Sequence, residues 1–217
     1  MCSSDLVVCI ELVGVGHEVI ANHIHDAPHQ GVAFSGNDHV IERNVIERVC
    51  EETNDAGAIA AGRDWTMRGT AIRHNVIRDV RGFRGAGCNG VMLDDLFSGT
   101  AIVGNLFERV SRGVMVGGGR DNRIEDNVFR DCGTAIRIDA RGLGWAAYSI
   151  EESMMPKLVA MPYQAPPWST HYPQLAGILD DDPAAPRGNR IARNVSVRCI
   201  AEDIDPSARS LVEVVGN

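Results

Sequence analysis

The feature that most constrains the fold is a repeat centred on asparagine. Each of six segments has an aliphatic residue three positions before an asparagine, and five of them have an apolar residue two positions after it. The steps between these asparagines are 22, 31, 30, 22 and 67 residues, so the base period is 22 with insertions of 9, 8 and 45. The six asparagines are Asn22, Asn44, Asn75, Asn105, Asn127 and Asn194.

A second element, a short β-rich run, recurs in each unit. The runs begin at Gly31, Gly57, Gly90, Gly113 and Ala135, with a weaker one at Ala201. A unit this short cannot hold a strand–helix–strand crossover of ~30 residues. It fits one coil of a parallel β-helix, and the multi-leucine signature of leucine-rich repeats is absent.

Stacking of such coils places equivalent residues about 4.8 Å apart. The aliphatic residues then form buried columns, and the asparagines form a hydrogen-bonded ladder at a turn, because asparagine tolerates left-handed geometry. Cys132 and Cys199 both lie five residues after a ladder asparagine, which predicts that they belong to a core column.

We therefore expect an all-β parallel β-helix of about six coils with one irregular, partly helical insertion. Residues 1–141 form coils, residues 142–187 form the insertion, and residues 188–217 return to a further, truncated coil. The strand pattern begins at once at Val7 and stops within a strand at Asn217, so we expect a piece of a longer chain. Met1–Asp5 shows no signal peptide.

Composition excludes several classes. The net charge of -8 argues against a nucleic-acid partner, and no apolar run is long enough for a membrane span. The six cysteines include no C-x-x-C pair, so we expect small buried side chains rather than a zinc site. His23, His25 and His29 are an alternative metal set, but their spacing alternates between strand faces and supplies no fourth ligand.

Aspartates at the ends of the β-rich runs are the candidate catalytic groups. Asp94 and Asp95 end the third run, Asp139 ends the fifth, and the fourth ends in glycines followed by Asp121. Two coils separate Asp94 from Asp139, about 9–10 Å at the backbone, with a gap at the glycines. Inverting glycosidases use an acid and a base ~6.5–9.5 Å apart around a water.

Two other interpretations of these aspartates stay open. Aspartate after a strand is a common turn former. Carboxylates are also the ligands that calcium prefers, so Asp94, Asp95 and Asp121 are an alternative calcium site; otherwise no cofactor is expected.

Further polar and aromatic residues are expected to flank the acidic groups. Arg120 and Arg141 either orient carboxylates and sugar hydroxyls or form structural ion pairs. Trp65 is either a sugar platform or a packed loop anchor, and the aromatic insertion either lines a glycan cleft or forms a small satellite core. The candidate substrate-binding residues are Glu52, Asp55, Arg63, Asp64, Trp65, Arg120, Arg141, Trp145, Trp168 and Tyr172.

Several runs, taken in order, resemble a known family. They are Glu52–Ala58, Gly62–Thr66, Leu93–Asp95, Gly117–Asn122, Asp139–Trp145, Trp168, Tyr172-Pro173-x-Leu175 and Asp182–Asn189. Together they resemble the bacterial right-handed parallel β-helix glycoside hydrolases of pectin-lyase-like fold, with α-L-fucosidase and xylanase activities. The resemblance implies an aspartate acid/base pair among Asp94, Asp95, Asp121 and Asp139, a carbohydrate substrate, and a secreted or periplasmic protein.

The leading hypothesis is a glycoside hydrolase, inverting by its expected carboxylate spacing. The second is a polysaccharide lyase or uronate epimerase, which needs Lys, Arg, His or Tyr as base; Lys157 is the only lysine and lies in the insertion. The third is a non-catalytic glycan-binding β-helix.

Overall fold

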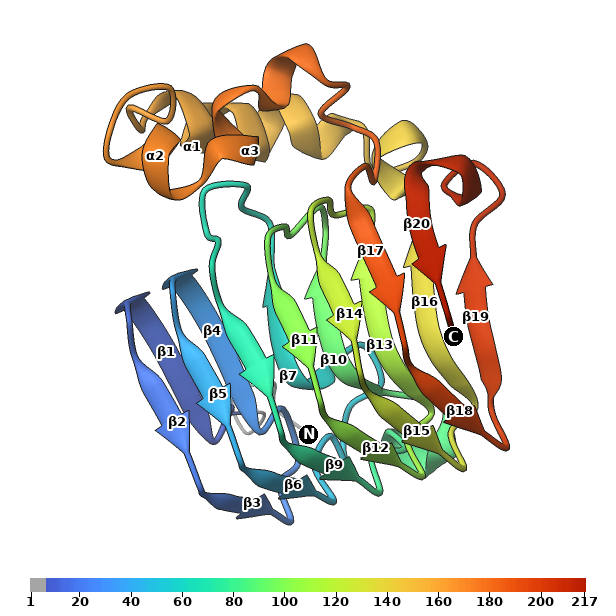
Figure 1. Cartoon of the computed structure of the whole chain (residues 1–217). Helices are drawn as coiled ribbons and strands as arrows, with labels where there is room; N and C mark the ends of the chain where they lie inside the picture. Colours follow the sequence, from blue (N-terminus) through green and yellow to red (C-terminus); the bar gives the residue numbers. More distant parts are fainter. Residues whose placement is uncertain (1–6) are drawn as a thin grey trace.

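The computed structural model describes residues 7–217 as a parallel β-helix made of three sheets (Figure 1). The Met1–Asp5 stretch and Cys2 lie outside the described residues. Sheet A has seven strands: β1 (Ile10–Val15), β4 (Val32–Asn37), β7 (Gly57–Gly62), β10 (Asn89–Asp94), β13 (Arg112–Gly117), β16 (Thr134–Asp139) and β19 (Ile200–Ile204).

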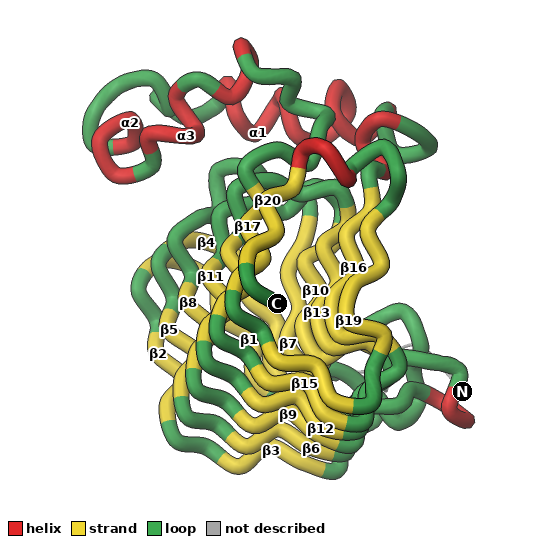
Figure 2. Tube along the Cα trace, turned by 45° about the vertical axis from the view of Figure 1, so that its right-hand side comes forward, coloured by secondary structure: helices red, strands yellow, loops and turns green. Residues whose placement is uncertain are grey.

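Sheets B and C complete each coil (Figure 2). Sheet B has β2 (Glu18–Ile20), β5 (Val40–Glu42), β8 (Ala71–Arg73), β11 (Ala101–Val103), β14 (Arg123–Glu125), β17 (Asn189–Ala192) and β20 (Val212–Val215). Sheet C has β3 (His23–His25), β6 (Val45–Glu47), β9 (Val76–Arg78), β12 (Leu106–Glu108), β15 (Val128–Arg130) and β18 (Val195–Val197). The chain makes six full coils, and β19 and β20 begin a seventh, which agrees with the predicted fold.

The asparagine ladder is present and continuous at the corner between sheets B and C. Asn105 Oδ1 accepts hydrogen bonds from the backbone N–H and the side-chain amide of Asn75, at 2.9 and 3.0 Å. Asn127 Oδ1 accepts the same two hydrogen bonds from Asn105. The ladder runs from Asn22 to Asn217. The amides bond from coil to coil, but the left-handed conformation expected of the asparagines belongs to the residue before each of them, such as Arg43 with φ 54°.

A second polar column, missed in the sequence, lies at the corner between sheets A and B. Asn122 Oδ1 accepts the backbone N–H of Thr100 at 3.0 Å, and Asn189 accepts Asn122 at the same distance. His39 plays this part in an earlier coil, where its Nδ1 lies 3.2 Å from the backbone nitrogen of His17. The residue type at this corner changes along the stack, from histidine through threonine to asparagine, so no single residue marks the repeat.

Aliphatic side chains fill the interior in columns, as expected from the repeat. Ile41, Ile72 and Ile102 are fully buried and stack through sheet B, and the rings of Phe107 and Phe129 stack 4.8 Å apart. Cys132 lies in this core and Cys199 packs against it, as the repeat predicts.

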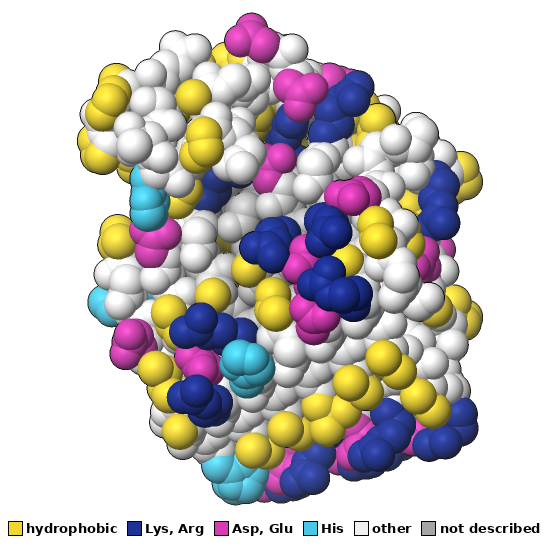
Figure 3. Space-filling view, viewed as in Figure 1, with side chains coloured by type: hydrophobic (Ala, Val, Ile, Leu, Met, Phe, Trp, Pro, Cys, Tyr) yellow, Lys and Arg dark blue, Asp and Glu magenta, His cyan; other side chains and the backbone are white. Residues whose placement is uncertain are grey.

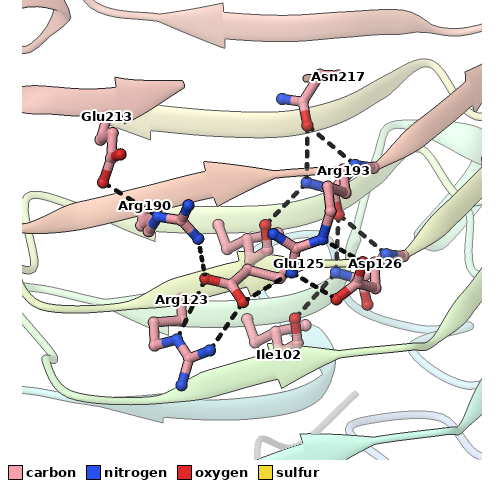
Figure 4. A network of polar contacts seen from close by, with 11 residues as sticks. Ile102, Arg123, Glu125, Asp126, Arg190, Arg193, Glu213 and Asn217 are labelled. Carbon is pink, nitrogen blue, oxygen red and sulfur yellow. Dashed lines mark hydrogen bonds and ion pairs between the residues drawn. The ribbon is translucent and has the colours of Figure 1, made fainter. Parts of the chain in front are cut away.

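The outer faces of sheets B and C carry ion pairs and one aliphatic row (Figure 3). On sheet B, the buried Glu125 accepts hydrogen bonds from Arg123, Arg190 and Arg193 (Figure 4). These hydrogen bonds, the one from Arg123 first, lower the pKa of Glu125 to about 2. On sheet C, the row consists of Val45, Val76, Leu106, Val128 and Val195.

The insertion, residues 142–187, leaves the coils after β16 and returns at β17, covering the turns between sheets A and B (Figure 1). Its helical segments begin at η3 (Arg141–Leu143), followed by a π-helical turn η4 (Ile150–Met154), α1 (Met155–Val159), α2 (Trp168–His171), α3 (Pro173–Ala176) and η5 (Ile178–Asp180). Two further 3-10 turns are η2 (Phe83–Gly85) and η6 (Arg209–Leu211). Among the described residues no helix has the length and hydropathy to cross a membrane.

The insertion has a small hydrophobic core that is distinct from the main core inside the coils. Leu158, Leu175 and Ile178 pack with Met154, and the coils contribute Trp65 and Leu96 to the same cluster. The satellite-core interpretation of the insertion is therefore confirmed, and it fixes the insertion as a wall beside sheet A.

Candidate functional site

The insertion stands on one side of sheet A and the loop that carries η2 on the other (Figure 2). Between them a groove crosses the outer face of this sheet. It consists of three adjoining hollows of about 300, 470 and 330 Å³. The first two share Asp55, Arg63, Met92 and Asp94, and the last two share Arg141 and Trp145. The groove thus extends over strands from β4 to β16 and reaches the turn after β19.

Strand alternation explains which side chains reach this groove. Val91 and Leu93 of β10 point into the core, so Met92 and Asp94 point outward. The same register places Met115 and Gly117 of β13 beside them. Because the strands end at one edge, the residues that close each strand gather under the insertion.

Arg141 joins three of the four predicted catalytic aspartates. Its Nη1 donates to Asp94 at 2.6 Å and to Asp95 at 2.8 Å, while its Nη2 and Nε donate to Asp139 at 2.9 and 3.1 Å. Asp95 also accepts a 2.6 Å hydrogen bond from Nε of Arg63. Asp94 and Asp139 therefore lie on either side of one guanidinium group.

The gap expected at the glycines is occupied. Leu93 pairs with Val116, and Gly117 pairs with Asp139, so Gly117 separates the two aspartates as predicted. The side chain of Arg141 lies in that space, and it comes from the first turn of η3 after β16. The repeat could not predict this, because Arg141 belongs to the irregular segment.

The pKa values of Asp94 and Asp95 are shifted in opposite directions. Burial, and then repulsion from Asp95, raises the pKa of Asp94. Burial alone would also raise the pKa of Asp95, but hydrogen bonds from Arg141 and Arg63 outweigh it and lower that pKa. Burial opposes the charge of Arg141, yet its bonds to Asp139 and Asp95 raise its pKa. Of these two neighbouring carboxyl groups, Asp94 is the one that more readily carries a proton.

Asp121 lies elsewhere, beneath the insertion. Its carboxylate pairs with the buried Arg68 at 2.9 Å and lies 3.5 Å from Nε of Arg120. Nη1 of Arg120 donates to the backbone carbonyls of Asp181 and Asp182 in the insertion. None of the three hollows includes Asp121 or Arg120. The structure therefore separates these two residues from the Asp94 cluster and shows Arg120 in structural ion pairs.

The predicted residues of the 51–66 segment fall into two groups. Asp55 and Arg63 both line the first two hollows of the groove. Asp64 is buried and caps the turn by accepting the Thr66 N–H at 2.8 Å, while Trp65 is only 1% exposed and packs in the insertion core. Trp65 is thus the loop anchor and cannot stack on a sugar. Glu52 is exposed and lines none of the three hollows.

Among the predicted aromatic residues, Trp145 alone reaches the groove. Its side chain is 67% exposed, and the guanidinium of Arg141 lies 5.3 Å from its ring. Trp168 packs against the insertion core, and Tyr172 donates a 2.7 Å hydrogen bond to Asp38 of the second coil. These two residues hold the far end of the insertion on the coils.

The structure does not assemble the alternative metal sites from their predicted residues. Asp94 and Asp95 bind Arg141 while Asp121 binds Arg68, and His23 and His25 contact Glu47 and Asp26. Within residues 7–217 no group of three or more His, Cys, Asp or Glu side chains is arranged to hold a metal ion.

The sequence missed the residues on the other side of the groove. Arg112 and Asn89 lie at the start of β13 and β10 and line the largest hollow, together with Asn54, Ser111 and Thr134. Their signal lies at the beginnings of the β-rich runs, whereas the predicted aspartates lie at the ends.

Comparison with known proteins gives one match. The family model described as a right handed beta helix region matches residues 8–148. No curated protein and no solved structure matches significantly.

Proposed function

Because the chain belongs to the right-handed β-helix family, we propose that it is a glycoside hydrolase that binds a polysaccharide along sheet A. A right-handed β-helix is consistent with the pectin-lyase-like fold of proteins that act on polysaccharides. The single observation that carries the proposal is the placement of Asp94 and Asp139 on either side of Arg141 in an open groove.

In the proposed reaction, Asp94 is the general acid. Its raised pKa keeps a proton available, and it lines both hollows that meet above β10. It donates this proton to the oxygen of the scissile glycosidic bond, as an inverting enzyme requires. Asp139 is the base that takes a proton from the attacking water.

Arg141 and Asp95 prepare this pair. Arg141 donates hydrogen bonds to Asp139 through two nitrogens, which holds the carboxylate of the proposed base in place. The negative charge of Asp95 raises the pKa of Asp94. Trp145 offers an exposed ring at the junction of two hollows, where a sugar face can stack.

Among its described residues the groove lacks three of the four side-chain types that can act as base in an elimination reaction. The three hollows are lined by no Lys, His or Tyr side chain. Lys157 donates to the Arg63 carbonyl at 2.6 Å, and Arg141 has a raised pKa, so neither is suited to remove a proton from a sugar carbon.

A non-catalytic glycan-binding protein is the second candidate. It is favoured by the ion pairing of the carboxylates, since Asp95 contacts two arginines and Asp139 accepts hydrogen bonds from two nitrogens of the Arg141 guanidinium. Such neutralised groups would serve to shape a binding surface.

The deciding experiment is hydrolysis of pectin fragments and xylan by the wild type, Asp94→Asn and Asp139→Asn. Both variants should lose at least ~100-fold in rate while remaining folded. Asp126→Asn, which changes an exposed aspartate far from the groove, is the matched control. Proton NMR should show an inverted anomer, and a retained anomer contradicts the inverting mechanism. Unsaturated products absorbing in the ultraviolet would assign a lyase, and glycan binding without any cleavage would assign a binding protein.

A further inference from the structure

Three arginines stand apart from the others in their ion pairing. The chain has 21 basic residues, and all except Lys157 are arginines. Every arginine has a carboxylate within 4.0 Å among the described residues except Arg81, Arg84 and Arg112. These three lie on the side of the groove opposite the insertion. In a chain of net charge -8, such unpaired cations are unusual.

Arg112 is the one that lines the groove. It is half-buried at the start of β13, where the register places it between Asn89 and Thr134. Its Nη1 donates to Asn89 Oδ1 at 2.9 Å, and Asn89 in turn donates to the Ala56 carbonyl at 2.9 Å. The described residues accept no other hydrogen bond from this guanidinium. The hydrogen bond to Asn89 therefore orients the Arg112 guanidinium, and its remaining N–H groups have no acceptor among the described residues.

The surroundings of Arg112 suit a sugar that carries a negative group. Asn54, Ser111 and Thr134 line the same hollow with neutral polar groups. The hollow has three arginines and three aspartates, but Arg63 and Arg141 are bonded to Asp94 and Asp95. Arg112 and the exposed Asp55 are therefore the two charged side chains of this hollow that have no oppositely charged group within 4.0 Å among the described residues.

We infer that Arg112 binds an anionic substituent of the glycan, a carboxylate or a sulfate ester. A guanidinium presents parallel N–H donors that match the two oxygens of either group. This inference rests on the proposed function, because it names the class of polysaccharide that the groove selects. Arg112 and Asp94 line one hollow from opposite sides, so a chain lying between them directs its acidic group to Arg112 and its glycosidic oxygen to Asp94.

The test measures binding separately from catalysis. In the Asp94→Asn background, isothermal titration calorimetry is carried out with oligogalacturonate and with its carboxyl-reduced, neutral form. A sulfated galactan oligosaccharide and its desulfated form make the second pair, which distinguishes a carboxylate from a sulfate. Arg112→Gln should weaken binding of the preferred acidic ligand by about 10- to 100-fold and binding of its neutral form by less than about 2-fold. Arg112→Lys should recover part of the loss, because it keeps the charge without the paired donors.

Arg43→Gln is the matched control, since Arg43 is an exposed arginine at the corner between sheets B and C. It should leave every affinity unchanged. Equal binding of the acidic and neutral forms, or an acidic preference that survives Arg112→Gln, overturns the inference. If a neutral glycan alone is hydrolysed and bound, the proposed function stands and the inference fails. If no glycan is bound or cleaved, both fail.

Discussion

Arg141 lies flat against Gly117, and the missing side chain of this glycine is what gives it room. A Cβ atom on Gly117 would lie 2.6 Å from Cζ of Arg141, well inside van der Waals contact. The carboxylates of Asp94 and Asp139 are therefore bridged through a space that the strand leaves empty.

Gly117→Ala should displace the Arg141 guanidinium and separate the two aspartates from their common partner. We expect a fall in kcat of about 10-fold or more, because small misplacements of reacting groups are costly in rate. The measurement is kcat and its pH profile on the cleaved glycan. Gly177→Ala, at a glycine with no atom within 4 Å of the added Cβ, should behave as wild type. An unchanged pH profile in Gly117→Ala would mean that Arg141 does not set the protonation of the pair.

Asp95→Asn should move the alkaline limb of the activity profile to lower pH. Activity requires protonated Asp94, so it falls as the pH rises through the pKa of Asp94. The charge of Asp95 helps to raise that pKa, and its removal should lower it. The pH dependence of kcat/KM measures the shift, and a limb that moves to higher pH would contradict the assignment of Asp94 as the acid.

The same substitution should reduce stability at neutral pH. The pKa of Asp95 is lowered in the folded protein, so its carboxylate stabilises the fold above its ordinary pKa, and this contribution is lost as the pH falls through the folded value. Wild type and Asp95→Asn should therefore converge in urea stability toward acid pH. A constant difference between them at every pH would show that charge is not the cause.

Asn105→Ala should destabilise the coils from within. Asn105 Oδ1 accepts two hydrogen bonds from Asn75, and its Nδ2 donates to Ile72 and Asn127. Each buried group left without a partner costs about 1–3 kcal/mol. Urea unfolding measures the loss. Asn22→Ala, in the exposed first coil, should lower the free energy of unfolding by less. An equal loss at both positions would show that burial of the ladder asparagines does not determine the loss.

Trp65→Ala should loosen the insertion while the coils remain folded. Its indole is buried among Met154, Leu158 and Leu175, and removal of a buried Trp costs about 3–5 kcal/mol. Hydrogen exchange and limited proteolysis should show opening within residues 142–187 alone. Trp145→Ala, at the exposed tryptophan, should leave exchange unchanged and weaken glycan binding. Cooperative loss of the whole fold in Trp65→Ala would show that the two cores are not separable.

The sequence was sufficient to predict the coils because each stacked coil places equivalent residues in the same structural environment. Asn44, Asn75 and Asn105 occupy equivalent corners, and the residues three before them occupy equivalent core positions. Insertions of 8 or 9 residues fall in loops and leave this register intact. The Thr100–Asn122 corner was missed because its residue type varies from coil to coil.

The site was only partly accessible from the sequence, since its decisive contacts join segments that do not repeat. Asp94 and Asp139 were placed by register, whereas Arg141 enters from a 3-10 turn that no period describes. Trp65 and Asp121 were predicted to lie in the groove, but the insertion folds back over both of them.

The insertion enters and leaves the sixth coil without disturbing the pairing around it. Ile124 pairs with Ile191 across a 67-residue step in the same register as Ile102 pairs with Ile124 across 22. The entropy of closing a loop grows only slowly with its length. One wall of the groove is therefore a module that is independent of the coil register: a longer, shorter or different segment at this place would reshape the groove while Asp94 and Asp139 keep their positions on sheet A.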